Sequence, residues 1–155
     1  MSRTRPRVGD VVEIEVPGGL GYAQYTHAHA QYGALLRVLP GVHPARPKRL
    51  ADLVAGPHRF QTFFPLHAAC ARGIVRVVGV FPIPASGVEF PLFRAGVVDP
   101  STGKVGANWW LWDGEREWRV GALTARQLAM PIRGVVNDTL LVERIVSNWR
   151  AEEVT

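Results

Sequence analysis

The fold is decided near the start of the chain, where residues 8–27 read VGDVVEIEVPGGLGYAQYTH. Between Val8 and Val16, one face is apolar and the other carries two glutamates, an alternation typical of a half-buried edge strand. Pro-Gly-Gly at 17–19 ends this strand, and a second alternating run extends from Leu20 to His27. Proline and glycine between two such runs favour a hairpin. A third strand at 32–39 is predicted to follow, so the chain begins as a β-meander.

The middle of the chain contains its most apolar run. Ile74–Ile83 is rich in valine and isoleucine, which is typical of a central strand covered on both faces. Pro65–Arg72, just before it, favours a short helix that ends at Gly73. The later strands are predicted at 90–98, 105–112 and 115–120, the last two joined by the turn residues Asp113 and Gly114.

The end of the chain changes period. Leu141, Ile145 and Trp149 recur four residues apart, with Val142 and Val146 beside them, which predicts one apolar stripe on a helix. Asn137 or Asp138 is the expected N-cap of this helix. We expect the stripe to pack on the sheet.

These patterns predict one mainly β (α+β) domain over residues 1–155, a bent antiparallel sheet or partly open barrel with a C-terminal helix packed on it. A chain of 155 residues buries about two-thirds of its unfolded surface, enough for a single core. Residues 1–7 are expected to be flexible. Residues 40–65 are dense in proline and glycine and predict a long ordered loop with at most one or two helical turns near Arg49–Val54.

Composition indicates the cellular location of the protein and the classes of partner to expect. Cys70 is the only cysteine, and residues 1–7 lack the apolar region of a signal peptide, so a cytoplasmic location is expected. The longest apolar run is too short to cross a bilayer, which predicts no membrane partner. The net charge is +5, but most arginines are scattered singly along the chain. A nucleic-acid partner is therefore considered but not preferred.

Residues that carry chemistry do not form a recognisable catalytic pattern. His27 and His29 share one side of a strand, as metal ligands sometimes do, but no third ligand stands at a diagnostic spacing, and surface histidines are the preferred interpretation. Cys70 lies in an apolar stretch, as a buried core residue does, rather than beside an activating base. The sequence thus predicts no enzyme activity, no catalytic residue, no metal site and no cofactor.

Tryptophan is concentrated in one segment, Asn108–Gly114, with Trp118 shortly after it. Along a strand Trp110 and Trp112 share a face and Trp109 points to the other. Both a buried core and an exposed binding anchor remain open, since tryptophan, tyrosine and arginine dominate binding hot spots. The predicted partner-binding set consists of Tyr22, Tyr25, Tyr32, Arg46 and Arg49, with Trp112 or Trp118 as an anchor if either is exposed.

Five short segments resemble the immunity protein 26 family of bacterial polymorphic toxin systems. They are Gly9–Ile14, Gly21–Tyr25, Val77–Ile83, Phe90–Phe93 and Trp109–Gly114. The resemblance covers most of the chain. It implies a β-rich protein that binds a toxin, occludes its active site and performs no reaction of its own; the family supplies no catalytic residues.

Two features depart from that expectation. An inhibitor of a nuclease usually presents an acidic face, whereas this chain is basic, so the expected partner is an acidic toxin or a toxin that is not a nuclease. The proline-rich segment 40–65 has no counterpart in the resemblance. The alternative function is a small β-barrel module that binds nucleic acid through aromatic stacking and phosphate contacts.

Overall fold

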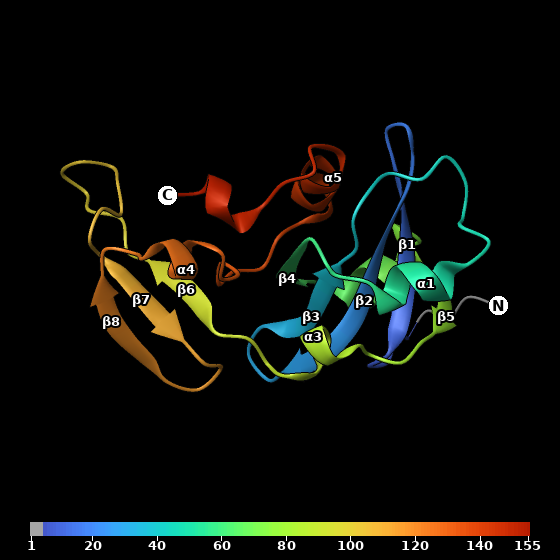
Figure 1. The fold of residues 1–155 in the computed structure, drawn as a ribbon, viewed down its shortest axis with the longest axis horizontal. Coiled ribbons are helices and arrows are strands. Elements are labelled where there is room, and N and C mark those ends of the chain that lie inside the picture. Colours follow the sequence, from blue (N-terminus) through green and yellow to red (C-terminus); the bar gives the residue numbers. More distant parts are fainter. Residues whose placement is uncertain (1–4) are drawn as a thin grey trace. The chain divides into compact units, whose positions relative to one another are not determined.

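The computed structural model describes residues 5–155, so the first four residues of the segment expected to be flexible lie outside the described range. The fold is mainly β, with two open antiparallel sheets and few helices, as the sequence predicts. Figure 1 shows the two sheets. The chain divides into two compact units, one comprising residues up to Glu89 with Gly134–Trp149, the other Phe90–Arg133 with Arg150–Thr155. The single domain inferred from chain length stays a prediction.

The first unit is built on a five-stranded sheet in the order β4-β3-β2-β1-β5. Its strands are β1 (Asp10–Val16), β2 (Gly19–His29), β3 (Gly33–Val38), β4 (Phe60–Phe64) and β5 (Val75–Val80). The predicted hairpin forms, with Val16 opposite Gly19 across its turn. β3 continues the meander as predicted.

The positions of β1 and β5 in this sheet are the reverse of those predicted. β1 pairs with both β2 and β5 and is buried on both faces, whereas β5 is an edge strand whose Val80 is 61% exposed. The alternation in β1 was misleading because Glu13 is buried with partners rather than solvated. An apolar run therefore does not by itself distinguish a central strand from an edge strand.

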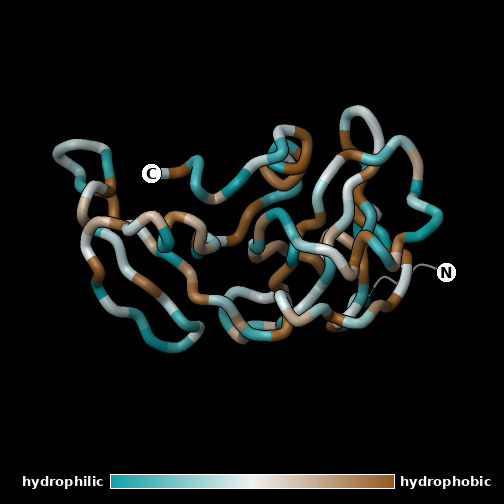
Figure 2. The backbone as a smooth tube through the Cα atoms, in the orientation of Figure 1, coloured by the Kyte–Doolittle hydropathy of each residue, from teal (hydrophilic) through white to brown (hydrophobic). Residues whose placement is uncertain are grey.

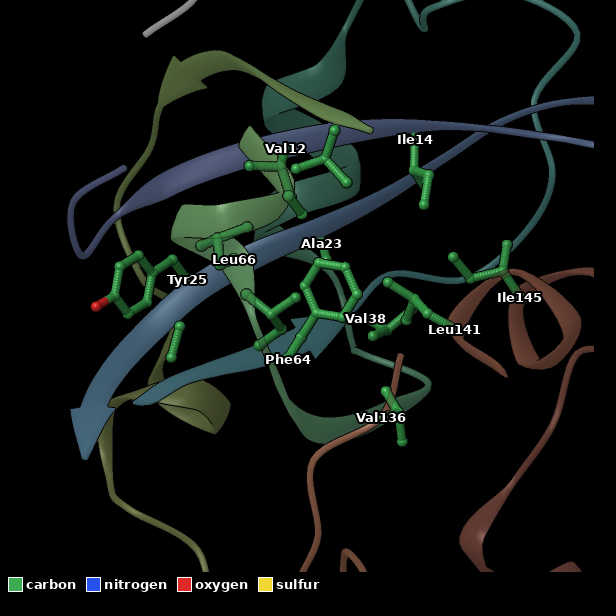
Figure 3. Packing of buried hydrophobic residues seen from close by; sticks show 14 of the residues in the cluster. Val12, Ile14, Ala23, Tyr25, Val38, Phe64, Leu66, Val136, Leu141 and Ile145 are labelled. Carbon is green, nitrogen blue, oxygen red and sulfur yellow. The ribbon is translucent and has the colours of Figure 1, made fainter. Parts of the chain in front are cut away.

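Helices cover both faces of the five-stranded sheet. Helix α2 (Leu66–Ala71) and helix α5 (Asp138–Val146) pack on one face, where Val12 and Ile14 of β1 meet Leu141 and Ile145 of α5 (Figure 3). On the other face Val11 and Tyr22 pack with α1 (Leu50–Ala55). Figure 2 shows hydrophobic residues along the strands and on α5. The predicted C-terminal helix thus packs on the sheet, and Asn137 caps it by accepting a hydrogen bond from the Leu140 amide at 2.8 Å.

Segment 40–65 is more regular than the long loop predicted for it. The expected helical turns form α1, but Phe60–Phe64 forms β4 and pairs with residues 34–38 of β3. The density of proline and glycine concealed this strand, although its aromatic residues favour β structure. The loop proper is residues 40–49, between β3 and α1.

A buried arginine joins α1 to the sheet. Arg37 on β3 is fully buried and donates hydrogen bonds to Gln24 and to the carbonyls of Val54 at 2.9 Å and Gly56 at 2.6 Å. Burial lowers the pKa of its guanidinium. These carbonyls lie at the C-terminal end of α1, where the helix leaves them without intrahelical partners, so Arg37 fixes the end of this helix on the sheet.

The second unit contains a three-stranded sheet in the order β6-β7-β8. Its strands are β6 (Phe93–Gly96), β7 (Trp109–Trp112) and β8 (Glu117–Gly121). The first two are shorter than predicted because an irregular loop fills residues 97–108 between them. Helix α3 (Ala85–Val88) precedes this unit, and α4 (Ala125–Leu128) and a 3-10 turn (Ala151–Glu153) complete the helices. None of the helices in residues 5–155 has the length and apolarity needed to cross a membrane.

Candidate functional site

A carboxylate buried inside the five-stranded sheet organises the most elaborate polar cluster of the first unit. Glu13 on β1 lies between Tyr22 on β2 and Arg76 on β5, its register partners on either side. Its carboxylate accepts hydrogen bonds from the Tyr22 hydroxyl at 2.7 Å and from Nε and Nη2 of Arg46 at 2.8 and 3.2 Å. Arg76 Nε lies 3.6 Å from Oε1 of the same carboxylate. We call Glu13, Tyr22, Arg46 and Arg76 the Glu13 cluster.

The charges in the Glu13 cluster are fixed at neutral pH. The hydrogen bond from Arg46 lowers the pKa of Glu13, and the Tyr22 hydrogen bond and the nearby arginines add to this, while burial alone acts in the opposite direction. Burial and the Glu13 carboxylate raise the pKa of Tyr22. Glu13 is therefore an anion that accepts from a neutral tyrosine and lies against two cations.

The cluster fixes the 40–49 loop on the sheet. Leu20 and His43 exchange two backbone hydrogen bonds, at 2.7 and 2.9 Å, and the His43 ring meets Tyr22 edge-on with ring centroids 5.6 Å apart. Gly19 allows this approach, because a Cβ at that position would lie 2.1 Å from the His43 carbonyl oxygen. The loop is therefore held on the sheet at two points, by backbone hydrogen bonds at His43 and by the side chain of Arg46.

The 40–49 loop, which we call the docked loop, and strand β5 present positive charge to solvent. The Arg46 side chain is 49% exposed although its guanidinium is held by Glu13, and Arg76 on β5 is similarly half-exposed. Lys48 and Arg49 are exposed, and Arg49 pairs at 2.9 Å with the exposed Asp52. The surface therefore combines two cations fixed by Glu13 with two freer ones on the loop.

The predicted partner-binding residues differ in burial and belong to two compact units. Tyr22 and Tyr25 are buried, so their rings offer no area for direct contact with a partner, contrary to the prediction. Trp112, predicted as an anchor only if exposed, is buried as well. Tyr32 is half-buried and stacks on Phe63, with ring centroids 5.2 Å apart. Arg46 and Arg49 lie on the docked loop. Trp118 is 41% exposed on β8 and belongs to the other compact unit.

Burial of the two tyrosines has a simple cause. The hairpin that carries Tyr22 and Tyr25 has a covering layer on each face, so both sides of the strand become core. Glu13 and Arg76, which complete the cluster, were not predicted. Only the pairing of β1 with β5 brings them together, and no local pattern encodes that pairing.

The histidines and the cysteine serve the local structure. His27 Nδ1 contacts the Thr26 hydroxyl and Nε2 the Val88 carbonyl, each at 2.9 Å, and His29 Nδ1 accepts the amides of Gln31 and Tyr32. Burial, with a smaller effect of the Asp10 charge, raises the pKa of the Cys70 thiol to about 11. In the described part of the chain, histidine, cysteine and acidic residues form no group of three or more that could hold a metal ion.

Comparison of the chain with family models, with curated proteins and with solved structures gives no match. The segments that resemble the immunity protein 26 family lie mainly on strands: Gly9–Ile14 leads into β1, Gly21–Tyr25 lies in β2, and Trp109–Gly114 begins with β7. Function must therefore be argued from the docked loop and its charges.

Proposed function

We propose that the chain is a bacterial immunity protein, which binds a toxin in the cytoplasm and blocks it by covering its active site, with no reaction of its own. The observation that supports this most is the 40–49 loop, an ordered cationic surface element held by a buried carboxylate. The resemblance to the immunity protein 26 family is a separate reason for the same proposal.

An ordered loop suits protein recognition because binding must otherwise immobilise it. Fixing a flexible side chain at an interface costs about 0.5–1.5 kcal/mol. Arg46 is already held by two hydrogen bonds to Glu13, so most of this cost has been met in folding. Its exposed half remains available to a partner.

The charge of the loop indicates the chemistry of the partner. Arg46, Lys48 and Arg49 would meet carboxylates on the toxin, and such complementarity accelerates association and discriminates against cationic partners. The proposed partner is therefore a toxin with an acidic face beside its active site. Inhibition would follow from steric occlusion.

The alternative, a nucleic-acid-binding module, receives less support. Phosphates would also be attracted to the cationic loop. However, base stacking requires exposed rings, and Tyr22 and Tyr25 on the hairpin of the same unit are buried. Trp118 is exposed, but it belongs to the other compact unit.

The first test is an affinity pull-down of the tagged protein from its own lysate, washed at low and at high salt. A stoichiometric protein that survives high salt, and whose activity the purified chain then abolishes, is expected. Recovery of nucleic acid that is lost at high salt, with no such protein, would favour the alternative.

Binding between the purified chain and its purified toxin then tests whether the 40–49 loop is the contact surface. Arg46→Ala and Arg49→Ala should each weaken binding about tenfold or more, as truncation of an interfacial arginine does at a hot spot. Arg72→Ala, at an exposed arginine after α2, is the matched control and should leave the affinity unchanged. Unchanged affinity in both loop variants would reject the loop as the contact surface.

A further inference from the structure

The outer strand of the three-stranded sheet has one unpaired edge. β8 pairs with β7 on one side only, and no described strand lies on its other side, as Figure 1 shows. Glu117, Trp118 and Arg119 are consecutive residues of β8 and are all exposed. Such an edge is a template for pairing with another strand where it is regular, and the one irregularity of β8 lies at Val120, beyond Arg119.

The hydrogen bonds of the hairpin establish which backbone groups of β8 face outward. Asp113 donates its amide to the Arg116 carbonyl at 3.1 Å, so these two residues form a hydrogen-bonded pair. Hydrogen-bonded and non-hydrogen-bonded pairs alternate along an antiparallel ladder. Trp118 therefore bonds inward to Leu111, while the amides and carbonyls of Glu117 and Arg119 point to the open edge.

We propose that β8 pairs with β8 of a second copy of this chain, antiparallel about a two-fold axis at Trp118. In this register Glu117 of each copy lies opposite Arg119 of the other, and both residues have their backbone groups directed across the new interface. The two Trp118 residues then form the intervening non-hydrogen-bonded pair, in which side chains approach most closely.

Charge selects this register over its neighbours. A shift of two residues in one direction places Glu117 opposite Glu117 of the other copy. A shift of two residues in the other direction places Arg119 opposite Arg119 of the other copy. Like charges directly opposite each other destabilise a sheet, whereas opposite charges stabilise it. Only the register centred on Trp118 gives two complementary pairs.

The side chains are already oriented for this pairing. Glu117 and Arg119 share a face of the sheet with their β7 partners Trp112 and Trp110, and Trp118 lies on the opposite face with Leu111. Arg133 holds Glu117 at 2.8 Å, and Arg119 Nη2 donates to the Ala107 carbonyl at 3.1 Å. A carboxylate has about four acceptor positions and a guanidinium about five donors, so both keep capacity for a partner across the interface.

Charge reversal in the full chain tests the register, with light scattering over a concentration series as the readout. The native chain should reach the mass of a dimer as concentration rises. Glu117→Arg and Arg119→Glu should each raise the dissociation constant at least about tenfold, because each places two like-charge pairs across the axis.

An equimolar mixture of the two variants separates loss of pairing from loss of folding. The arginine introduced in one variant would face the glutamate introduced in the other, and the unchanged Arg119 of the first would face the unchanged Glu117 of the second. The mixture should therefore recover the native dimer. Arg116→Glu is the matched control, because residue 116 faces Val120 in this register, and it should dimerise normally. A native chain that stays monomeric at every concentration, or a mixture that associates no better than either variant alone, would overturn the proposal.

Discussion

A carboxylate inside a β-sheet costs several kcal/mol unless hydrogen bonds and opposite charges compensate for its lost hydration. Glu13 has both, since a tyrosine and an arginine donate to it and a second arginine lies close by. The Arg46 and Arg76 side chains remain half-exposed, so the cluster couples a core position to the surface. Glu13 thus contributes both to local stability and to the placement of the loop.

Replacing this carboxylate should destabilise the first unit. Glu13→Gln keeps the shape but removes the charge that Arg46 and Arg76 contact, and we expect a loss of about 1–3 kcal/mol in the free energy of unfolding at neutral pH. Chemical denaturation measures it. Glu15→Gln is the control, because Glu15 is exposed and pairs with the half-exposed Arg76 at 3.5 Å; it should cost far less.

The native chain and Glu13→Gln should also differ in how their free energy of unfolding depends on pH. Because folding lowers the pKa of Glu13, ionised Glu13 contributes stability that is fully present above the unfolded pKa, about 4.3. This contribution is lost as the pH falls through the lower folded pKa. The stability gap between the native chain and Glu13→Gln should therefore narrow on acidification below about pH 4.3. A gap that stays constant down to about pH 2 would contradict this account.

Cys70 should be unreactive in the folded chain. It is buried, and its thiol pKa of about 11 leaves almost no thiolate at neutral pH. Alkylation followed by mass spectrometry should label it only slowly without denaturant and rapidly in urea, and Cys70→Ala should retain partner binding. Rapid labelling of the native protein, with loss of function, would instead favour a cysteine-dependent activity.

At the scale of elements, the 40–49 loop depends on one glycine. Gly19 has a φ of 152°, and a Cβ there would lie 2.1 Å from the His43 carbonyl oxygen, which is backbone and cannot swing away. The loop therefore docks only because β2 begins with a residue that has no side chain.

Gly19→Ala should release the loop from the sheet. We expect a larger loss of stability than for Gly33→Ala, where φ is also positive at 83° but nothing lies within 4 Å of the added Cβ. Gly33→Ala thus measures the cost of backbone strain without a clash, about 1–3 kcal/mol. Gly19→Ala should additionally weaken binding to an acidic partner, measured by calorimetry, since Arg46 would lose its position. Equal effects of both substitutions would show that loop docking is dispensable.

Local sequence patterns predicted the existence and type of most helices and strands. The order of the strands and the buried contacts depend on pairing between distant segments, which those patterns do not encode. The hairpin turn, the helix cap at Asn137 and the stripe around Leu141 depend on neighbours in sequence, so they could be predicted. The central place of β1, the edge place of β5 and the Glu13 cluster depend on contacts between residues far apart. For the same reason Arg46 and Arg49 were found as exposed loop residues, whereas the burial of the hairpin tyrosines was not foreseen.

At the scale of the whole molecule, the two compact units carry different spectroscopic reporters. Four of the five tryptophans, 109, 110, 112 and 118, belong to the second unit, and Trp149 belongs to the first. Cys70 is buried in the first unit. Tryptophan fluorescence and thiol accessibility can therefore follow the unfolding of each unit separately.

The second unit should unfold at a lower urea concentration than the first. Units of about 50 residues bury too small a share of their surface to be more than marginally stable. This one also buries Arg94, whose guanidinium donates to the Leu128 and Ala151 carbonyls and lies over the Trp109 ring. In a Trp149→Phe background, the fluorescence transition should precede the exposure of Cys70 to alkylation. Glu13→Gln should then shift only the thiol transition. Coincident transitions that shift together would instead establish the single cooperative domain predicted from the length of the chain.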